Sequence, residues 1–151
     1  MALIKEEITT ASEWMAAALL SSGYNADFSL SSFAEVERFF NEHSANGFPR
    51  AGSFLANDTD SRIFAMGCYI GEVIRRVKGG EWQGSDDDPN VKVNLELRLP
   101  DGSVSWPTQR AMRRLKNGSP DSIVAYAQEL GATTHAGAKA GKKGLFKRLF
   151  G

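Results

Sequence analysis

The side chains best suited to chemistry lie in one stretch, GCYIGEVIRRVKGGEW, which covers residues 67–82. Glu72 precedes Arg75 and Arg76 by three and four positions, so on a helix its carboxylate lies beside both guanidinium groups. An exposed pair of this kind contributes only about 0.2–0.5 kcal/mol, and a solvated ion pair is the simplest interpretation. The alternative is a partly buried Glu72 that holds an arginine, or the turn before Trp82, in place.

A ligand-binding function for this stretch would use its aromatic and charged residues. The binding residues predicted here are Tyr69, Glu72, Arg75, Arg76 and Trp82. A catalytic carboxylate needs a second titratable partner, and nothing in the sequence nominates one, so no catalytic residue is predicted. A small ligand-binding or hydrolase-like domain with a pocket near Glu72 remains an alternative function.

Two glycines lie inside the same stretch. Gly67 and Gly71 are four residues apart and therefore share one face of a helix, at a cost of roughly 1 kcal/mol each in helix propensity. Their missing side chains predict a close approach of another part of the chain to this face. Packing is the main interpretation, and a ligand groove is the alternative.

The remaining catalytic and metal-binding candidates are weak. Cys68 is the single cysteine and lies among apolar residues, where a free cysteine acts as a small hydrophobic residue. His43 falls near a predicted helix end, and His135 lies in a segment of small residues. The acidic loop SDDDPN lacks the ligand spacing of an EF-hand. The sequence also lacks the nucleophile-elbow, phosphate-loop and dinucleotide motifs, so we predict no metal and no cofactor.

A second basic group lies in QRAMRRLKNG. A helix there places Arg110, Arg113 and Arg114 on one side, where they could bind phosphate or an acidic protein surface. A solvated basic face is the simpler interpretation.

The charge of the chain is polarised although its net charge is zero. The five basic residues after Glu129 give the end of the chain +5, and the 13 basic and 18 acidic residues before them give −5. Residues 131–144 are rich in glycine, alanine and lysine and predict a flexible linker. The last seven residues, 145–151, form an apolar and basic tail. Its candidate contact residues are Leu145, Phe146, Lys147, Arg148, Leu149 and Phe150.

Composition predicts a single globular domain over residues 1–130. The 151 residues are 42% hydrophobic and 10% aromatic, which is enough for one core. The N-terminus carries three charged residues among its first seven and has no signal-peptide pattern. No apolar run approaches the ~20 residues of a membrane span. These features favour a cytoplasmic protein, and the acidic body does not favour nucleic-acid binding.

Helices are predicted for most of the first half. In TASEWMAAALLSS, Thr10 and Glu13 have the spacing of a capping box, and Ser32 and Glu35 repeat it in SSFAEVERFFNEH. From Gly47 onwards a loop is expected.

A third helix is predicted over residues 63–77. Its apolar residues recur every three or four positions, and the Gly79-Gly80 pair ends it. Asp58, Thr59 or Asp60 could cap its start.

The second half changes to strand patterns. Residues 91–99 alternate apolar and polar side chains, which predicts a strand with one buried face. Trp82 before it and SVSW after the PDGS turn predict two more strands of an antiparallel meander. Pro107 begins the next helix, and Ser119 caps the last one. The expected architecture is α+β, with about five helices on a three-stranded meander and a flexible basic tail.

The stretches GCYIGEVIRRVKGGEW, WPTQRAMRRLKNG and SPDSIVAYAQEL together resemble a family of small bacterial domains of unknown function. The likeness covers roughly residues 10–130, and its signature is G-x-Y-x-G-E-V-x-R followed by G-G-x-W. The resemblance implies an accessory, immunity-type or adaptor protein more than an enzyme.

Three functions follow from these observations. The first is a non-enzymatic bacterial protein-binding module, of the immunity or secretion-associated kind, whose partner is another protein. The second is the ligand-binding or hydrolase-like domain with a pocket near Glu72. The third is peripheral association of the tail with an anionic membrane, to which each basic residue near the surface contributes about 1 kcal/mol.

Overall fold

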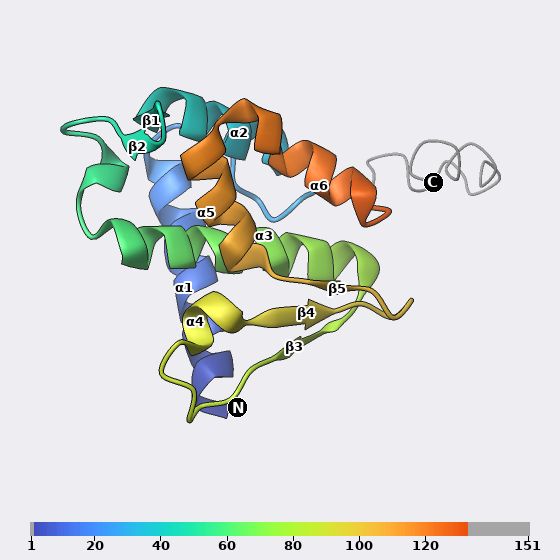
Figure 1. The fold of residues 1–151 in the computed structure, drawn as a ribbon. Helices are drawn as coiled ribbons and strands as arrows, with labels where there is room; N and C mark the ends of the chain where they lie inside the picture. The colour runs from blue at the N-terminus through green and yellow to red at the C-terminus, as the bar shows by residue number, and fades with distance from the viewer. Residues whose placement is uncertain (1, 133–151) are drawn as a thin grey trace, which may run out of the picture.

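The computed structural model describes residues 2–132, which form an α+β fold as predicted (Figure 1). Of the predicted linker, 131–144, only Gly131 and Ala132 are described, and the predicted tail at 145–151 lies outside the described residues. The α-helices within the described part are α1 (Ala2–Ser21), α2 (Ser32–His43), α3 (Thr59–Lys78), α4 (Val91–Asn94), α5 (Pro107–Asn117) and α6 (Ile123–Glu129). Its strands are β1 (Ser44–Ala45), β2 (Phe48–Pro49), β3 (Glu81–Gln83), β4 (Glu96–Arg98) and β5 (Val104–Ser105).

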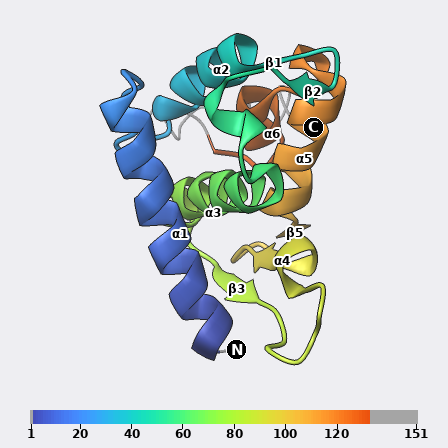
Figure 2. The same cartoon turned by 90° about the vertical axis from the view of Figure 1, so that its left-hand side faces the viewer.

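The central element is α3, which packs between α1 on one side and α5 on the other (Figure 2). Every residue from Ile63 to Ile74 is buried, so this helix is surrounded by the rest of the domain. As predicted, it ends at Gly79, and the chain turns there into β3. A single hydrophobic core contains residues from Ile4 at one end of the described chain to Ala132 at the other.

The first helix is longer than predicted. It begins at Ala2, and Thr10 lies in its middle, so the proposed capping box is wrong. The reason is a buried stripe that continues towards the N-terminus through Ile4 and Ile8, which belong to the core. Trp14, from the same segment, stays exposed.

The capping box proposed for α2 is also absent. The Ser32 hydroxyl donates to the carbonyl oxygen of Ser29 and shares a hydrogen bond with the Tyr69 hydroxyl, and Ser31 is the N-cap residue. After α2 the chain forms a short hairpin of β1 and β2 where a loop was expected. Its turn is Asn46-Gly47, with φ of 56° and 87°, the pair that two-residue hairpins favour.

The predicted meander is confirmed, but its long strand is only half right. β3, β4 and β5 pair antiparallel in that order, and Trp82 lies opposite Leu97. Residues 91–94 instead form the helical turn α4 and none of them is buried. The Asp88 carboxylate accepts from the Asn90 backbone and the Asn94 side chain, which stabilises this turn.

The last helices differ from prediction at one boundary. α5 begins at Pro107 as expected. Ser119 begins a short 3-10 helix, Ser119–Asp121, and the cap of α6 is Ser122, whose hydroxyl accepts from the Ala125 backbone. None of the helices that the structure describes has the length and apolarity to cross a membrane.

Candidate functional site

The predicted charged cluster is a buried anchor inside the fold. Glu72 is only 7% exposed and accepts hydrogen bonds from the Trp82 indole at 2.7 Å and from Arg75 at 2.8 and 3.0 Å. The Arg76 guanidinium lies 3.7 Å from the same carboxylate. The carboxylate thus joins the last turns of α3 to β3, which supports the second of the two interpretations of Glu72.

The two glycines permit this packing. A Cβ on Gly71 would lie less than 3.0 Å from the Cη2 and Cζ2 atoms of Trp82, and one on Gly67 would lie 2.5 Å from the Cα of Thr108. The indole therefore lies directly on α3 at Gly71, and the start of α5 lies on it at Gly67. Close packing, and not a ligand groove, accounts for both positions.

Tyr69, which lies between the two glycines, also makes its contacts inside the fold. Tyr69 is fully buried, and its hydroxyl accepts from the Phe28 backbone at 3.0 Å and shares a hydrogen bond with Ser32 at 2.7 Å. The Arg76 guanidinium lies 3.8 Å from the centroid of the Phe28 ring. Arg75 and Arg76 keep part of their side chains in solvent.

The environment of Glu72 lowers its pKa. Burial alone raises the pKa of this carboxyl, but the hydrogen bonds from Arg75 and Trp82 and the nearby guanidinium charges outweigh burial, so its pKa lies below the ordinary 4.5. We expect Glu72→Gln to lower the free energy of unfolding by about 1 kcal/mol at neutral pH, since the ion pair with the partly exposed Arg75 is lost. Urea denaturation measures this difference.

The same substitution makes a prediction about pH. Because folding lowers the pKa of Glu72, its ionised form stabilises the folded state above pH 4.5, and this contribution disappears as the pH falls through the lower folded-state value. The stability gap between the native protein and Glu72→Gln should therefore narrow as the pH falls below 4.5. Exposed Glu81 supplies a control, because Glu81→Gln should leave the free energy of unfolding at neutral pH within about 0.5 kcal/mol of the native value. A gap that stays constant with pH would contradict this account.

Cys68 and His43 occupy different environments. Burial raises the pKa of the Cys68 thiol, whose residue lies in the core on α3. His43 stacks on Phe39 with ring centroids 4.4 Å apart, and its Nδ1 accepts from the Phe54 backbone. Burial also lowers the pKa of His43. Among the described residues, no group of three or more histidine, cysteine, aspartate or glutamate side chains could hold a metal ion.

The arginines of α5 do not share one solvated face. Arg114 is 1% exposed, and it donates to Glu37 at 2.8 Å and to the Asn41 side chain at 2.9 Å. Arg110 and Arg113 instead lie on the outer side and pair with Asp121 at 3.7 and 3.2 Å. The expectation of a three-arginine surface is therefore corrected, because the third arginine points into the junction of α2 and α5.

A groove that none of the predicted binding residues lines runs beside the first half of α3. Its cavity volume is about 710 Å³, and it lies between α1, the start of α3 and α4. In Figure 2, the N-terminal half of α1 extends below α3, and α4 lies across from it on the right of the view. Its lining includes Leu3, Glu6, Trp14, Asp58, Arg62 and Lys92.

Exposed apolar side chains form the α1 wall of the groove. Leu3 and Trp14 are 68% and 46% exposed. They are eleven residues apart, which is about three helical turns, so they lie on one face of α1. The Trp14 ring stacks on Phe54 at 5.8 Å, and the Arg62 guanidinium lies 4.2 Å from the Phe54 centroid and 5.8 Å from that of Trp14. These contacts fix the tryptophan while its outer face stays open to solvent.

The charges of the groove leave acidic groups available. Lys92 pairs with Glu7 at 3.2 Å and lies 5.0 Å from the Phe64 ring, and Arg62 donates to the Phe54 carbonyl oxygen. Glu6 and Asp58 also line the groove, and no ion pair among residues 2–132 involves either of them. The two basic groups thus have partners already, and the two free carboxylates favour an incoming cation.

In the sequence, the one residue that points to this groove, Trp14, has two interpretations. Trp14 fits an amphipathic helix as well as a core residue, and only the longer α1, with Ile8 and Met15 on the buried side, turns Trp14 outwards. The second wall comes from residues 58–65 and from Lys92, which no local pattern connects to α1.

Comparison with known proteins adds no family to this description. No protein-family model matches the chain, and no curated protein or solved structure matches it significantly. The fold and the groove define the class as an α+β domain with an open apolar and acidic groove. The resemblance to small bacterial domains stays a prediction.

Proposed function

We propose that this chain is a non-enzymatic protein-binding module, and that its groove between α1 and α3 receives a short peptide segment with apolar and basic side chains. The observation that carries the proposal is Trp14, which stands exposed in the groove but is held in one orientation by Phe54 and Arg62. Tryptophan is enriched among the residues that dominate binding energy at protein interfaces.

The surroundings of Trp14 suit a peptide better than a small molecule. The groove is open along its length, with apolar Leu3 at one end and Trp14 three turns further along α1. Such a surface fits the helix-in-groove mode of recognition, in which apolar side chains repeat along the bound segment. Glu6 and Asp58 add a preference for lysine or arginine beside them. A bacterial origin, a cytoplasmic location and an immunity-type or secretion-associated role remain predictions that fit this function.

Selection from a random peptide library tests the proposal. The bait is the full chain with four tail residues, Leu145, Phe146, Leu149 and Phe150, changed to serine, so that the tail does not compete with the peptides. We expect the enriched peptides to combine apolar residues with lysine or arginine. Trp14→Ala should weaken their binding at least about tenfold, the effect of removing a central interface residue worth about 2 kcal/mol.

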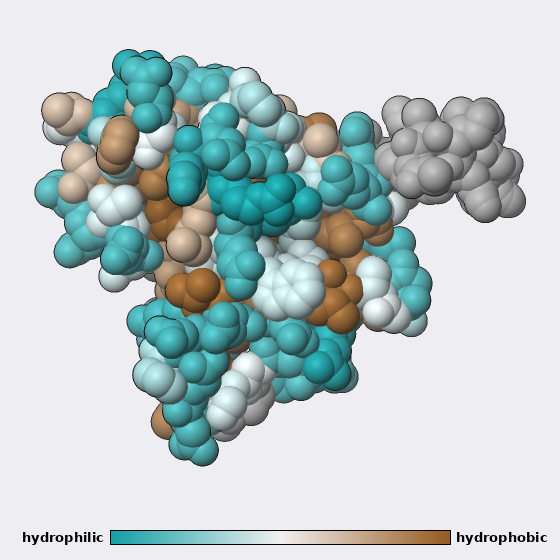
Figure 3. Space-filling view, in the orientation of Figure 1, coloured by the Kyte–Doolittle hydropathy of each residue, from teal (hydrophilic) through white to brown (hydrophobic). Residues whose placement is uncertain are grey.

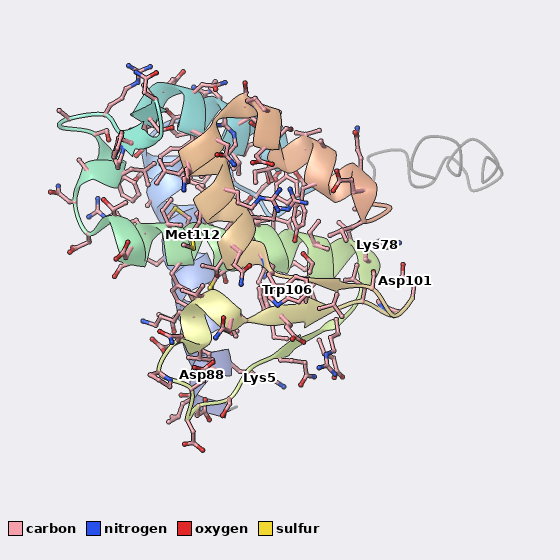
Figure 4. The ribbon with its side chains drawn as sticks, in the orientation of Figure 1. Lys5, Lys78, Asp88, Asp101, Trp106 and Met112 are labelled. Carbon is pink, nitrogen blue, oxygen red and sulfur yellow. The ribbon has the colours of Figure 1, made fainter. Side chains whose placement is uncertain are left out.

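Trp106 provides the matched control. It is 41% exposed, a fraction similar to that of Trp14, and it lies at the start of α5 (Figure 4). Figure 2 shows α5 on the side of α3 opposite α1. Trp106→Ala should leave the affinity of the selected peptides within about twofold of the unmodified bait, an energy change too small for a central contact. Peptides that bind equally well to the Trp14→Ala bait would overturn the proposed groove.

A further inference from the structure

The end of the described chain lies beside the end of α3. Ala132 is buried and its amide donates to the Ala127 carbonyl oxygen, which fastens the chain after α6. Gly131 lies against Lys78, because a Cβ built on Gly131 would lie 3.1 Å from the lysine Nζ. Lys78 is the last residue of α3, and Figure 4 shows it at the far end of that helix. Residues 133–151 therefore start from this end of the domain.

The last seven residues can reach the groove from this point. The groove lies at the other end of α3, and the sixteen residues from Arg62 to Lys78 span about 24 Å of helix. The twelve residues 133–144 can extend to about 40 Å. That length covers the helix and leaves about 16 Å for the path around the body.

The tail has the chemistry that the groove selects. Its sequence LFKRLFG has two apolar pairs four residues apart, with Lys147 and Arg148 between them. The groove offers exposed Leu3 and Trp14 to the apolar pairs and the carboxylates of Glu6 and Asp58 to the basic residues. The competing surface is made by the exposed apolar residues Val93, Val104, Trp106 and Met112, on α5 and on the segments before it. Figure 3 shows separate apolar patches on that side of the molecule. The acidic groups that line the groove favour it over this face as the site for a basic segment.

We infer that the C-terminal tail, residues 145–151, docks in the groove of its own chain and has to be displaced by a partner. This inference rests on the proposed peptide-binding function and names the first occupant of that site. Because the tail is tethered to the domain, weak contacts are sufficient to keep it in the groove. With an effective concentration of about 1 mM, a tail whose intrinsic Kd is about 100 μM occupies the groove about 90% of the time.

A spin label on the tail tests the docking in the full chain. Gly151→Cys accepts a nitroxide selectively, because the native Cys68 is buried. We expect the amide signals of Thr10, Ala11 and Trp14 in a ¹⁵N-labelled protein to lose at least half of their intensity. The amide of Met112, on the α5 side, serves as the reference. The loss should disappear when the four apolar tail residues are changed to serine, a change that keeps every charge. It should be reduced in Trp14→Ala, because a tenfold weaker contact lowers the occupancy of the groove to about half.

Competition gives a second measurement. The unmodified full chain should bind the library-selected peptides about tenfold more weakly than the four-serine variant, as expected when its own tail is present at about ten times its Kd. Equal affinities for the two chains would overturn the inference.

The remaining outcomes separate the inference from the proposed function. Intact groove signals together with selected peptides that depend on Trp14 would overturn tail docking and leave the proposed function standing. Signal loss only when a spin-labelled chain is mixed with a separate ¹⁵N-labelled chain would assign the tail to a second copy and overturn docking within one chain. Sedimentation with phosphatidylserine vesicles that depends on the tail, without signal loss in the groove, would assign it to a membrane and also overturn the inference.

Discussion

Replacing Arg114 by alanine should lower the free energy of unfolding by about 3 kcal/mol, the lower end of the cost of breaking a buried ion pair. Its guanidinium is the link between α5 and α2, because it donates to Glu37 and Asn41 and lies 5.1 Å from the Phe40 ring. The lower end applies because the Glu37 side chain is partly exposed and the solvent can hydrate it after the change. Urea denaturation followed by circular dichroism measures the loss.

The replacement of Arg114 should also affect the start of α6. The second carboxylate oxygen of Glu37 accepts hydrogen bonds from the Ile123 and Val124 amides at the start of that helix. Without Arg114 the carboxylate loses its positioning partner, so we expect the amides at the start of α6 to exchange with solvent faster than in the native protein. Native-state hydrogen exchange measures this second effect.

Arg113 is the matched control for this prediction. Its side chain is 54% exposed and pairs with Asp121, which Arg110 also contacts. Arg113→Ala should therefore cost less than about 1 kcal/mol, as surface ion pairs do. Equal losses for the two arginines would contradict the anchoring role of Arg114.

Gly71→Ala should destabilise the domain by about 2–3 kcal/mol, although alanine favours a helix by roughly 1 kcal/mol over glycine. The new methyl group would overlap the Trp82 ring and lie 3.0 Å from the Cγ of Pro107. The indole has little freedom to move away, because Glu72 accepts its N–H and the ring is buried. The measurement is the free energy of unfolding in urea.

A double-mutant cycle assigns this loss to its cause. Trp82→Phe removes the two ring atoms that the methyl group would meet, so the cost of Gly71→Ala in that background should fall below about 1 kcal/mol. Trp82→Phe has its own cost, because Glu72 loses a donor. The overlap is not the cause if Gly71→Ala costs the same in both backgrounds.

The predictions of element type from periodicity were mostly correct, whereas the predicted caps at Thr10, Ser32 and Ser119 were wrong. The repeat of apolar residues from Ile63 onwards identified α3, and the Gly79-Gly80 pair marked its end, because periodicity and backbone freedom are properties of the local chain. The alternation over residues 91–99 was misleading in its first half. There the Asp88 side chain accepts a hydrogen bond from the Asn90 backbone, which favours a helical turn over pairing with a neighbouring strand.

The predictions that depended on partners distant in sequence were incomplete. The sequence identified Glu72 as the unusual residue of its helix but could not show whether it was buried. Trp82 and Gly71 decide this together, since the indole lies on the glycine and donates to the carboxylate. Helical spacing predicted that Arg114 shares one surface with Arg110 and Arg113. Its burial follows from Glu37, 77 residues earlier in the chain.

The sequence by itself determined the α+β class, the central glycine-containing helix, the meander and the polarised charge, because each depends on residues that are close together in the chain. Only the tertiary structure decided that Glu72 and Arg114 are internal anchors and that Trp14 stands in an open groove. The physical reason is that burial is a property of the whole packing arrangement. Whether a side chain meets solvent, a ring or a carboxylate depends on elements that tens of residues separate, and the groove exists only where α1, α3 and α4 meet.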